Sequence, residues 1–447
     1  MTDIHALRVT DPNPFRAARA PNARTLYEAL KTSPVSAVVA EPAAMPVTTA
    51  PLSELAPIFE DLARGNATAS DGTVFRRGAR FPDGRLDLCK QVVGPQWIGT
   101  LVDATRMGGH ACGIEHFLLG NNVVGDDGAA RIAGLIADGN GPRLKTLYLA
   151  GNAFGPAGTA ALADALADDT EAEALWLKRN PLGPEGGAAL GRMLARNRTL
   201  RTLDLVNTGL LDAGVEALME GLSENSSLRT LYLDANGLTA GAARAIAGYF
   251  DGLKRRGQTG LTGLFIGINR LGDEGAAILA DALTGYAPLT RFDIGANRVE
   301  RSGLQAILSM ASTAPSLQYL GVGLYKSASD MGELPNWFGE EGAADIADFI
   351  RSESGLLILD AKDCHLGHEG VAMLADALED QHTLMDLRCT QYGIRDASLY
   401  HRIDAFLARN VEAARGISLA QFRNHELRII KHGPDIGRID SIYRNKM

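Results

Sequence analysis

The sequence has few cysteines, no long apolar run and no excess of positive charge. Its four cysteines in 447 residues are too few for a disulfide framework, and we expect free thiols. No apolar run approaches the ~18 residues of a membrane span, and the start MTDIHALRVTDPNPFR does not resemble a secretory signal. With 44 Lys and Arg against 53 Asp and Glu, the net charge of −9 argues against nucleic-acid and anionic-lipid partners. We therefore expect a soluble, cytoplasmic protein.

The motifs of common enzyme classes are also missing. The sequence has no G-x-x-x-x-G-K-[ST], no H-E-x-x-H and no G-x-S-x-G. Two clusters of His and Cys lack the spacing of a four-ligand zinc site. They are Cys89, His110, Cys112 and His116, and Cys364, His365 and His368. His425, His432 and Tyr443 near the C-terminus are more typical of capping or solvated residues than of an acid–base site. We expect no catalytic residue, no metal and no cofactor.

What the chain does have is a repeat. Segments such as LKTLYLAGNAFG from Leu144 and LRTLYLDANGL from Leu228 recur along it. Eleven starts follow at intervals of 31, 30, 28, 28, 28, 33, 28, 28, 39 and 28 residues. The starts are Asp83, Ile114, Leu144, Ala172, Leu200, Leu228, Leu261, Leu289, Leu317, Leu356 and Leu384. Self-similarity at this period indicates stacked supersecondary units.

Each repeat predicts a short strand followed by a helix. The L-x-x-L-x-L core alternates with a period of two, which is typical of a strand. An Ala- and Leu-rich stretch such as GTAALADALADD (Gly158–Asp169) follows, with its apolar residues at helical spacing. One unit cannot bury its apolar edge alone, so the units must stack. We expect an α/β solenoid, a horseshoe with a parallel sheet on its concave face and helices on its convex face.

These motifs resemble the leucine-rich repeat family, in particular its ribonuclease-inhibitor type with a strand–helix unit of about 28 residues. The resemblance extends from about Asp83 to Asn410. The ALADAL helices are also similar to those of bacterial effectors with Gly-Ala-Leu-Ala repeats, although no F-box is recognisable before them, and we expect a bacterial origin. The family includes inhibitors, GTPase activators, innate sensors and effectors, so the resemblance implies a fold rather than one function.

The two ends of the chain differ from the repeats. Residues 1–82 are rich in Pro and Ala, contain the helical patterns TLYEALK and LSELAPIFEDLAR, and are expected to form an N-terminal cap. Residues 83–410 are expected to be the solenoid of about eleven repeats. Residues 411–447 are expected to be a C-terminal cap and basic tail, because Arg423–Met447 has six Lys and Arg against three Asp and Glu. The tail is either a docking segment or partly disordered.

The position eight residues after each start has a structural explanation. A buried Asn amide in a turn can satisfy backbone N–H and C=O groups. Six repeats have Asn there: Asn122, Asn152, Asn180, Asn236, Asn269 and Asn297. The other five have Gln91, Thr208, Tyr325, Cys364 and Tyr392. We expect the asparagines to be structural, Cys364 to replace one of them, and the other turns to be satisfied differently.

The residues that alternate with the core leucines predict a binding face. Large aromatic side chains occur there, on a surface that polar residues could fill. Aromatic and Arg side chains are typical anchors of protein interfaces. We expect partner contacts from Tyr148, Trp176, Lys178, Arg179, Asp204, Tyr232, Asp234, Phe265 and Asp293. The alternative is that the rings only pack on neighbouring strands.

Two irregular spacings add residues between repeats. Five extra residues lie near FDGLKRRGQTG, which contains Lys254–Arg256, and eleven lie within YKSASDMGELPNWFGEEG. Insertions in repeats map to loops, which often carry function. We expect Trp337 and Phe338 in the second insertion either to fold back on the sheet edge or to contact a partner.

The sequence favours a non-catalytic protein-binding scaffold, adaptor or inhibitor whose protein partner binds the concave aromatic face. One alternative is a regulator of a GTPase or another enzyme, with Arg179 or Lys254–Arg256 as the groups to test. Another is an effector that acts on a foreign protein. Four acidic residues on the concave face favour a basic partner surface. They are Asp87, Asp204, Asp293 and Asp360. The sequence specifies neither the partner nor the oligomeric state.

Overall fold

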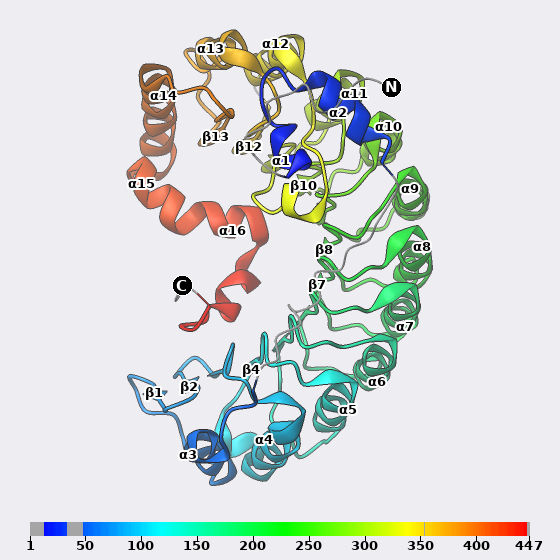
Figure 1. Cartoon of the computed structure of the whole chain (residues 1–447), viewed down its shortest axis with the longest axis vertical. Helices are drawn as coiled ribbons and strands as arrows, with labels where there is room; N and C mark the ends of the chain where they lie inside the picture. Colours follow the sequence, from blue (N-terminus) through cyan, green and yellow to red (C-terminus); the bar gives the residue numbers. More distant parts are fainter. Residues whose placement is uncertain (1–12, 34–47, 353, 445–447) are drawn as a thin grey trace. The chain divides into compact units, whose positions relative to one another are not determined.

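The computed structural model describes residues 13–33, 48–352 and 354–444, and the chain divides into two compact units. Unit 1 consists of Met1–Ala37, Gly237–Gln258 and Thr262–Gly433. Unit 2 consists of Val38–Asn236, Thr259–Leu261 and Pro434–Met447. In both units a helix follows each parallel strand, as the repeat predicts (Figure 1).

Unit 2 contains the strands of the first six repeats. Its strands are β1 (Thr73–Val74), β2 (Ala79–Arg80), β3 (Arg85–Asp87), β4 (His116–Leu118), β5 (Thr146–Tyr148), β6 (Ala174–Trp176), β7 (Thr202–Asp204) and β8 (Thr230–Tyr232). Its helices are α3 (Leu52–Ala63), α4 (Gly94–Gly108), η2 (Gly109–Cys112), α5 (Gly125–Ile136), α6 (Pro156–Leu166), α7 (Gly183–Arg196), α8 (Leu211–Leu222) and η5 (Pro434–Ile439). Strands β1, β2 and β3 pair antiparallel, and β3 to β8 pair parallel in chain order.

Unit 1 contains the last five repeats and the helix of the sixth. Its strands β9 (Gly263–Phe265), β10 (Arg291–Asp293), β11 (Tyr319–Gly321), β12 (Ile358–Asp360) and β13 (Asp386–Arg388) pair parallel in chain order. Its repeat helices are α9 (Ala240–Arg256), α10 (Gly272–Leu283), α11 (Arg301–Ser312), α12 (Gly339–Arg351), α13 (Gly367–Ala377) and α14 (Ala397–Arg415). Its other helices are α1 (Pro14–Ala17), α2 (Arg24–Lys31), η3 (Ser329–Met331), α15 (Leu419–Gln421), the π-helical turn η4 (Phe422–Glu426) and α16 (Leu427–His432).

The strands and helices enclose the core as the alternation predicts. The central strand leucines Leu147, Leu175 and Leu203 are fully buried. In unit 2 the helices α7 and α8 approach each other through glycines: a Cβ on Gly221 would overlap the carbonyl oxygen of Gly191. Glycine is therefore required where these two helix backbones meet.

The asparagines after the strands form a hydrogen-bonded ladder, as expected. Asn180 Nδ2 donates to the carbonyl oxygens of Leu149 (3.0 Å) and Leu177 (2.8 Å), and its Oδ1 accepts from the Asn152 backbone N–H (2.7 Å). Each amide thus ties its own turn to the turn before it. Backbone groups that would otherwise be buried without partners are satisfied in this way.

Two ladder positions differ from the expectation. Asn336, at the end of the second insertion, replaces Tyr325: its Nδ2 donates to Val322 O (2.8 Å) and its Oδ1 accepts from Asn297 N (2.8 Å). Gln391 replaces its neighbour Tyr392 and donates to Ala361 O (3.2 Å). Both corrections follow from counting eight residues after a start, which fails where an insertion or a one-residue offset separates the strand from its turn.

The first insertion is helix rather than loop, contrary to expectation. Lys254, Arg255 and Arg256 form the last turn of α9, which Gly257 ends at a φ of +60°. Cations at a helix C-terminus are stabilised by the helix dipole. Lys254 also pairs with Asp251 at 3.1 Å.

The helices of the N-terminal region are divided between the two units. Helix α3 packs against α4, at the start of the repeats, where a cap is expected. Helices α1 and α2 belong to unit 1, and the cluster of Ala18, Leu26, Tyr27 and Leu334 joins them to the second insertion. The apolar residues Leu26 and Tyr27 of α2 are buried there. At the other end, α14 continues to Arg415, past the predicted boundary at residue 410.

In the described part of the chain, no helix combines the length and apolar character needed to cross a bilayer.

Candidate functional site

The inner face of each sheet, defined here as the face opposite the repeat helices, carries the last residue of every parallel strand. In unit 2 the register pairs Tyr148 with Trp176, Trp176 with Asp204, and Asp204 with Tyr232. The middle residue of each strand is the core leucine. Because side chains alternate along a strand, these four residues share the inner face.

The three aromatic rings of unit 2 pack along this face. The ring centroids of Tyr148 and Trp176 lie 6.4 Å apart, and those of Trp176 and Tyr232 lie 5.7 Å apart. Tyr148, Trp176 and Tyr232 expose 2%, 3% and 5% of their surface, respectively. These rings therefore lie on the inner face but are nearly covered by their neighbours. The indole N–H of Trp176 is buried without a hydrogen-bond partner in the described structure. An unsatisfied buried donor costs about 1–3 kcal/mol.

Charged side chains flank the rings in two different ways. The Lys178 ammonium lies 6.0 Å from the centroid of Tyr148. Asp204 is buried, and burial raises the pKa of its carboxyl while Lys178 and a 2.9 Å backbone hydrogen bond lower it. Asp234 is also buried, and Arg179 is half-buried. Lys178 and Arg179 are therefore the more accessible of the predicted charged contacts in this unit.

The C-terminal segment of unit 2 occupies part of this inner face. Helix η5 lies against β4 and β5. The Arg444 guanidinium lies 4.5 Å from the Tyr148 ring centroid, and Arg438 pairs with Glu173 at 2.6 Å. The Thr202 hydroxyl donates to the Asp435 carboxylate at 2.8 Å. The inner face thus accepts a peptide segment through cations, rings and carboxylates.

Asp87 makes the most buried of these contacts. Its carboxylate accepts hydrogen bonds from the Ser441 hydroxyl and the Ile442 backbone N–H, both at 2.9 Å. Burial raises the pKa of this carboxyl, and the hydrogen bonds from Cys89, Ser441 and Ile442 oppose that shift. Asp87 therefore fixes the end of the C-terminal segment to the first parallel strand.

Unit 1 holds the preceding part of the C-terminal segment. The Lys431 Nζ lies 3.6 Å from Asp293 Oδ2 and 4.7 Å and 5.6 Å from the ring centroids of Tyr319 and Tyr325. The Tyr319 hydroxyl donates to the same Asp293 oxygen at 2.6 Å. Asp293 is 2% exposed, so the ammonium sits beside a buried carboxylate and two rings.

A second carboxylate and a stacked ring pair adjoin Lys431. Burial raises the pKa of the Asp360 carboxyl. The cations Lys431 and Arg388 lower this pKa, and the neighbouring carboxylate of Asp293 raises it. Phe265 is 1% exposed, and its ring stacks on His432 with centroids 5.6 Å apart and an interplanar angle of 22°. Of the residues predicted to contact a partner, Phe265 and Asp293 therefore contact this chain's own C-terminal segment.

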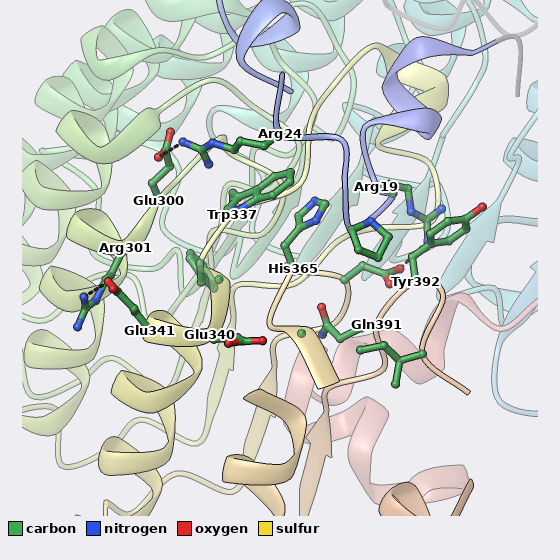
Figure 2. A pocket seen from close by; sticks show the side chains of 16 residues that line it. Arg19, Arg24, Glu300, Arg301, Trp337, Glu340, Glu341, His365, Gln391 and Tyr392 are labelled. Atoms are coloured by element: carbon green, nitrogen blue, oxygen red, sulfur yellow. Dashed lines mark hydrogen bonds and ion pairs between the residues drawn. The ribbon is translucent and has the colours of Figure 1, made fainter. Parts of the chain in front are cut away.

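A separate pocket of about 540 Å³ lies in unit 1 beside the second insertion (Figure 2). The Trp337 indole stacks on His365 with centroids 3.5 Å apart, and the Arg24 guanidinium lies 5.1 Å from the Trp337 ring. Phe338 is 3% exposed. Both side chains pack within the unit, and contact of Trp337 and Phe338 with a partner stays a prediction. Burial and the cations Arg24 and Arg19 lower the pKa of His365 to about 3.

Glu333 connects the N-terminal helices to this region. Its carboxylate pairs with Arg270 at 2.6 Å and Arg298 at 3.0 Å, and the three side chains are 4–6% exposed. Arg298 also donates to the Lys31 carbonyl (2.6 Å), and Arg270 donates to the Ser33 carbonyl (3.2 Å). Two buried arginines thus bind the end of α2, and Glu333 balances their charge.

The four cysteines, which the sequence predicts to be free thiols, lie in the interior. All four cysteines are buried and unpaired with one another. Burial raises the pKa of the Cys89 and Cys389 thiols to about 12, and Cys364 Sγ donates to Val322 O at 3.2 Å in the ladder. Across residues 13–33, 48–352 and 354–444, no three His, Cys, Asp or Glu side chains are placed to hold a metal ion.

A family model described as a leucine-rich repeat matches residues 196–219. This span covers the end of α7, all of β7 and most of α8, which is one strand–helix unit of the series. One unit of the series thus matches the leucine-rich repeat model, and the parallel strands alternating with helices give the chain a leucine-rich repeat fold. Leucine-rich repeat folds are scaffolds with extended binding surfaces, which suggests a protein-binding role.

Three solved structures are similar to parts of the chain. A tropomodulin C-terminal domain from Caenorhabditis elegans has 20% identity and a TM-score of 0.30, over 38% of this chain and 95% of that one. An internalin from Listeria monocytogenes has 16% identity and a TM-score of 0.37, over 82% and 97%. A structure described as the leiomodin-1 actin-binding site 2 has 13% identity and a TM-score of 0.19, over 61% and 96%. No curated protein sequence matches this leucine-rich repeat chain.

Sequence reasoning missed the residues that receive the C-terminal segment. Glu173 and Thr202 lie on repeat strands or beside them, but the repeat pattern gives them no distinctive signal. Tyr319 was visible as an aromatic residue two places before Gly321 in a leucine-rich repeat strand. The excess of Lys and Arg after Arg423 was the usable signal, because a basic segment complements the acids of the inner face.

Proposed function

We propose that this leucine-rich repeat protein is a non-catalytic protein-binding scaffold, an adaptor or inhibitor, that binds its partner on the inner faces. The observation that carries the proposal is that both inner faces already accept a peptide segment. In unit 2 Arg444 lies on Tyr148, and in unit 1 Lys431 pairs with Asp293. A surface that binds one segment through side-chain contacts has the chemistry to bind another.

The composition of the inner face supports this role. In unit 2 the row of three aromatic residues, the unpaired Trp176 N–H and the half-buried Lys178 and Arg179 combine apolar area with polar anchors. Aromatic and Arg residues are the most frequent hot spots of protein interfaces. The predicted contacts Tyr148, Trp176 and Tyr232 act in this proposal as the floor of the site, because they are nearly covered.

Affinity capture from native lysate tests the proposal. The inner-face variant is Lys178→Ala/Arg179→Ala, whose side chains are half-buried, and circular dichroism checks that its fold is preserved. The matched control is Arg192→Ala/Arg196→Ala, which changes exposed arginines on α7 of the same repeat. We expect a protein that wild type and control capture equally and that the inner-face variant captures about tenfold less, a loss of about 1.4 kcal/mol. Equal capture by all three proteins would contradict the proposal.

A further inference from the structure

We propose that the inner face of unit 1 is a binding site for a lysine side chain of a basic protein segment, and that Lys431 of this chain occupies that site in cis. The inference rests on the proposed protein-binding function and names the chemistry of the partner. It also makes the C-terminal segment a competitor that the partner displaces.

The site is built for an ammonium group. Asp293 Oδ2 lies 3.6 Å from the Lys431 Nζ, and the Tyr319 and Tyr325 rings lie 4.7 Å and 5.6 Å from it. Cations within about 6 Å of an aromatic ring are attracted by its quadrupole. The Tyr319 hydroxyl fixes the Asp293 carboxylate by a 2.6 Å hydrogen bond. A buried carboxylate needs a cation, so an apolar side chain at the same place would leave Asp293 uncompensated.

The residues after Lys431 indicate which residues should follow the lysine in a partner segment. His432 presents a planar ring that stacks on Phe265. Gly433 has a φ of +82°, a left-handed backbone conformation that glycine adopts without strain and other residues rarely adopt. The preferred occupant is therefore a lysine, then a planar side chain, then glycine.

The segment is held by contacts that can exchange. Over residues 427–444, all of which are described, Leu427 and Ile439 are the only buried apolar side chains, and Ile429 is 53% exposed. The remaining anchors are polar, such as the partly exposed Arg438. Ion pairs at partly exposed positions contribute little stability, and regions with few buried apolar contacts open at low free-energy cost. The tether gives Lys431 a high effective concentration, which a free segment must overcome.

Fluorescence anisotropy with a defined probe tests the inference. The probe is a fluorescein-labelled peptide of residues 427–435, added to full-length protein. Wild type should bind it weakly because the cis segment competes. Lys431→Met should bind it at least about tenfold tighter, since tethered ligands commonly gain 10²–10⁴ in avidity. The matched control Lys326→Met, which removes an exposed lysine of the same unit, should behave as wild type.

Two further arms identify the site. Lys431→Met/Asp293→Asn should lose the gain in affinity, with circular dichroism confirming the fold. A probe in which methionine replaces its own lysine should not bind Lys431→Met, and this arm needs no further change in the protein. Equal binding of the probe by wild type and Lys431→Met, or equal binding of both probes, would overturn the inference. The capture experiment on Lys178 and Arg179 in unit 2 is independent, so a negative probe result with positive capture removes the lysine site and leaves the proposed function standing.

Discussion

The N-terminal and C-terminal segments both pack on unit 1, but through different chemistry. Residues 13–33 are fixed by an apolar cluster around Tyr27 and Leu26 and by the buried Arg270–Glu333–Arg298 group. Residues 427–433 are held by a single buried apolar side chain, Leu427, by Lys431 beside Asp293 and by the His432 imidazole on Phe265. Both segments are short, so the difference between them is the kind of surface that they bury.

This contrast indicates which segment is part of the fold and which is an occupant. Burial of an aromatic side chain contributes several kcal/mol, whereas a partly exposed ion pair such as Arg438 with Glu173 contributes at most about 1 kcal/mol. Tyr27 is fully buried, while Lys431 keeps some contact with solvent. The N-terminal helices should open only with unit 1, and the C-terminal segment should open by itself.

The largest effect should come from removing the acid that anchors the N-terminal segment. Glu333→Ala leaves Arg270 and Arg298 buried without a counter-charge, and we expect a loss of about 3–5 kcal/mol in the free energy of unfolding. The matched control is Glu341→Ala, which removes an exposed acid paired with Arg301 and should cost under about 1 kcal/mol. Urea denaturation measures both. Similar losses for the two variants would show that the Glu333 group is not structural.

A smaller loss should follow from removing one hydroxyl in the same segment. The Tyr27 hydroxyl donates to the Pro335 carbonyl at 3.1 Å in the interior. Tyr27→Phe leaves that carbonyl unsatisfied and should cost about 1–3 kcal/mol in urea denaturation. Tyr392→Phe is the control, because Tyr392 is 52% exposed and its hydroxyl can bond to water. An unchanged midpoint for Tyr27→Phe would contradict the account of this anchor.

The pH dependence of stability sharpens the comparison, because His365 lies beside the N-terminal segment. Its pKa is lowered to about 3 from an ordinary value of 6.5. Between these two pH values His365 is protonated in the unfolded chain and neutral in the folded chain. This contribution is present above pH 6.5 and is lost as the pH falls from about 6.5 toward 3. His365→Phe keeps a ring against Trp337 and should reduce the loss of stability between pH 6.5 and pH 4. Identical pH profiles of the melting temperature for variant and wild type would refute this assignment.

The smallest effect on stability should come from the C-terminal segment. Lys431→Met should lower the free energy of unfolding by less than either Glu333→Ala or Tyr27→Phe, because release of the C-terminal segment exposes Asp293 to water without opening the core. The repeats stay intact in such a variant. A loss comparable to that of Glu333→Ala would mean that the C-terminal segment is as structural as the N-terminal one.

The repeat made most of the fold predictable from the sequence. Leucines such as Leu175 at strand centres and Asn180 in the turn depend on local spacing alone, so their burial and hydrogen bonds follow from the pattern. Insertions break that spacing. Asn336 could not be assigned to the ladder because eleven extra residues precede it, and Lys254 could not be placed in a helix because the extra residues near it extended α9.

The site was less predictable because it depends on contacts between residues distant in the chain. The alternation placed Phe265 and Asp293 on the inner face, but it could not show that His432 and Lys431 cover them. The same holds for Trp337, whose neighbour His365 follows it by 28 residues and whose neighbour Arg24 precedes it by 313 residues (337 − 24). Composition indicated a basic tail and an acidic face, and only the structure shows which cation meets which acid.

Hydrogen–deuterium exchange of the full-length protein tests the central claim most directly, namely that the C-terminal segment is an exchangeable occupant of the inner face. Amides of residues 427–444 should exchange faster than those of residues 24–33. Their exchange should accelerate further as salt is raised, because screening weakens the partly exposed ion pair of Arg438 with Glu173 while leaving the cluster around Tyr27 unaffected. Equally slow, salt-independent exchange in both segments would contradict the claim and make the C-terminal segment a permanent part of the fold.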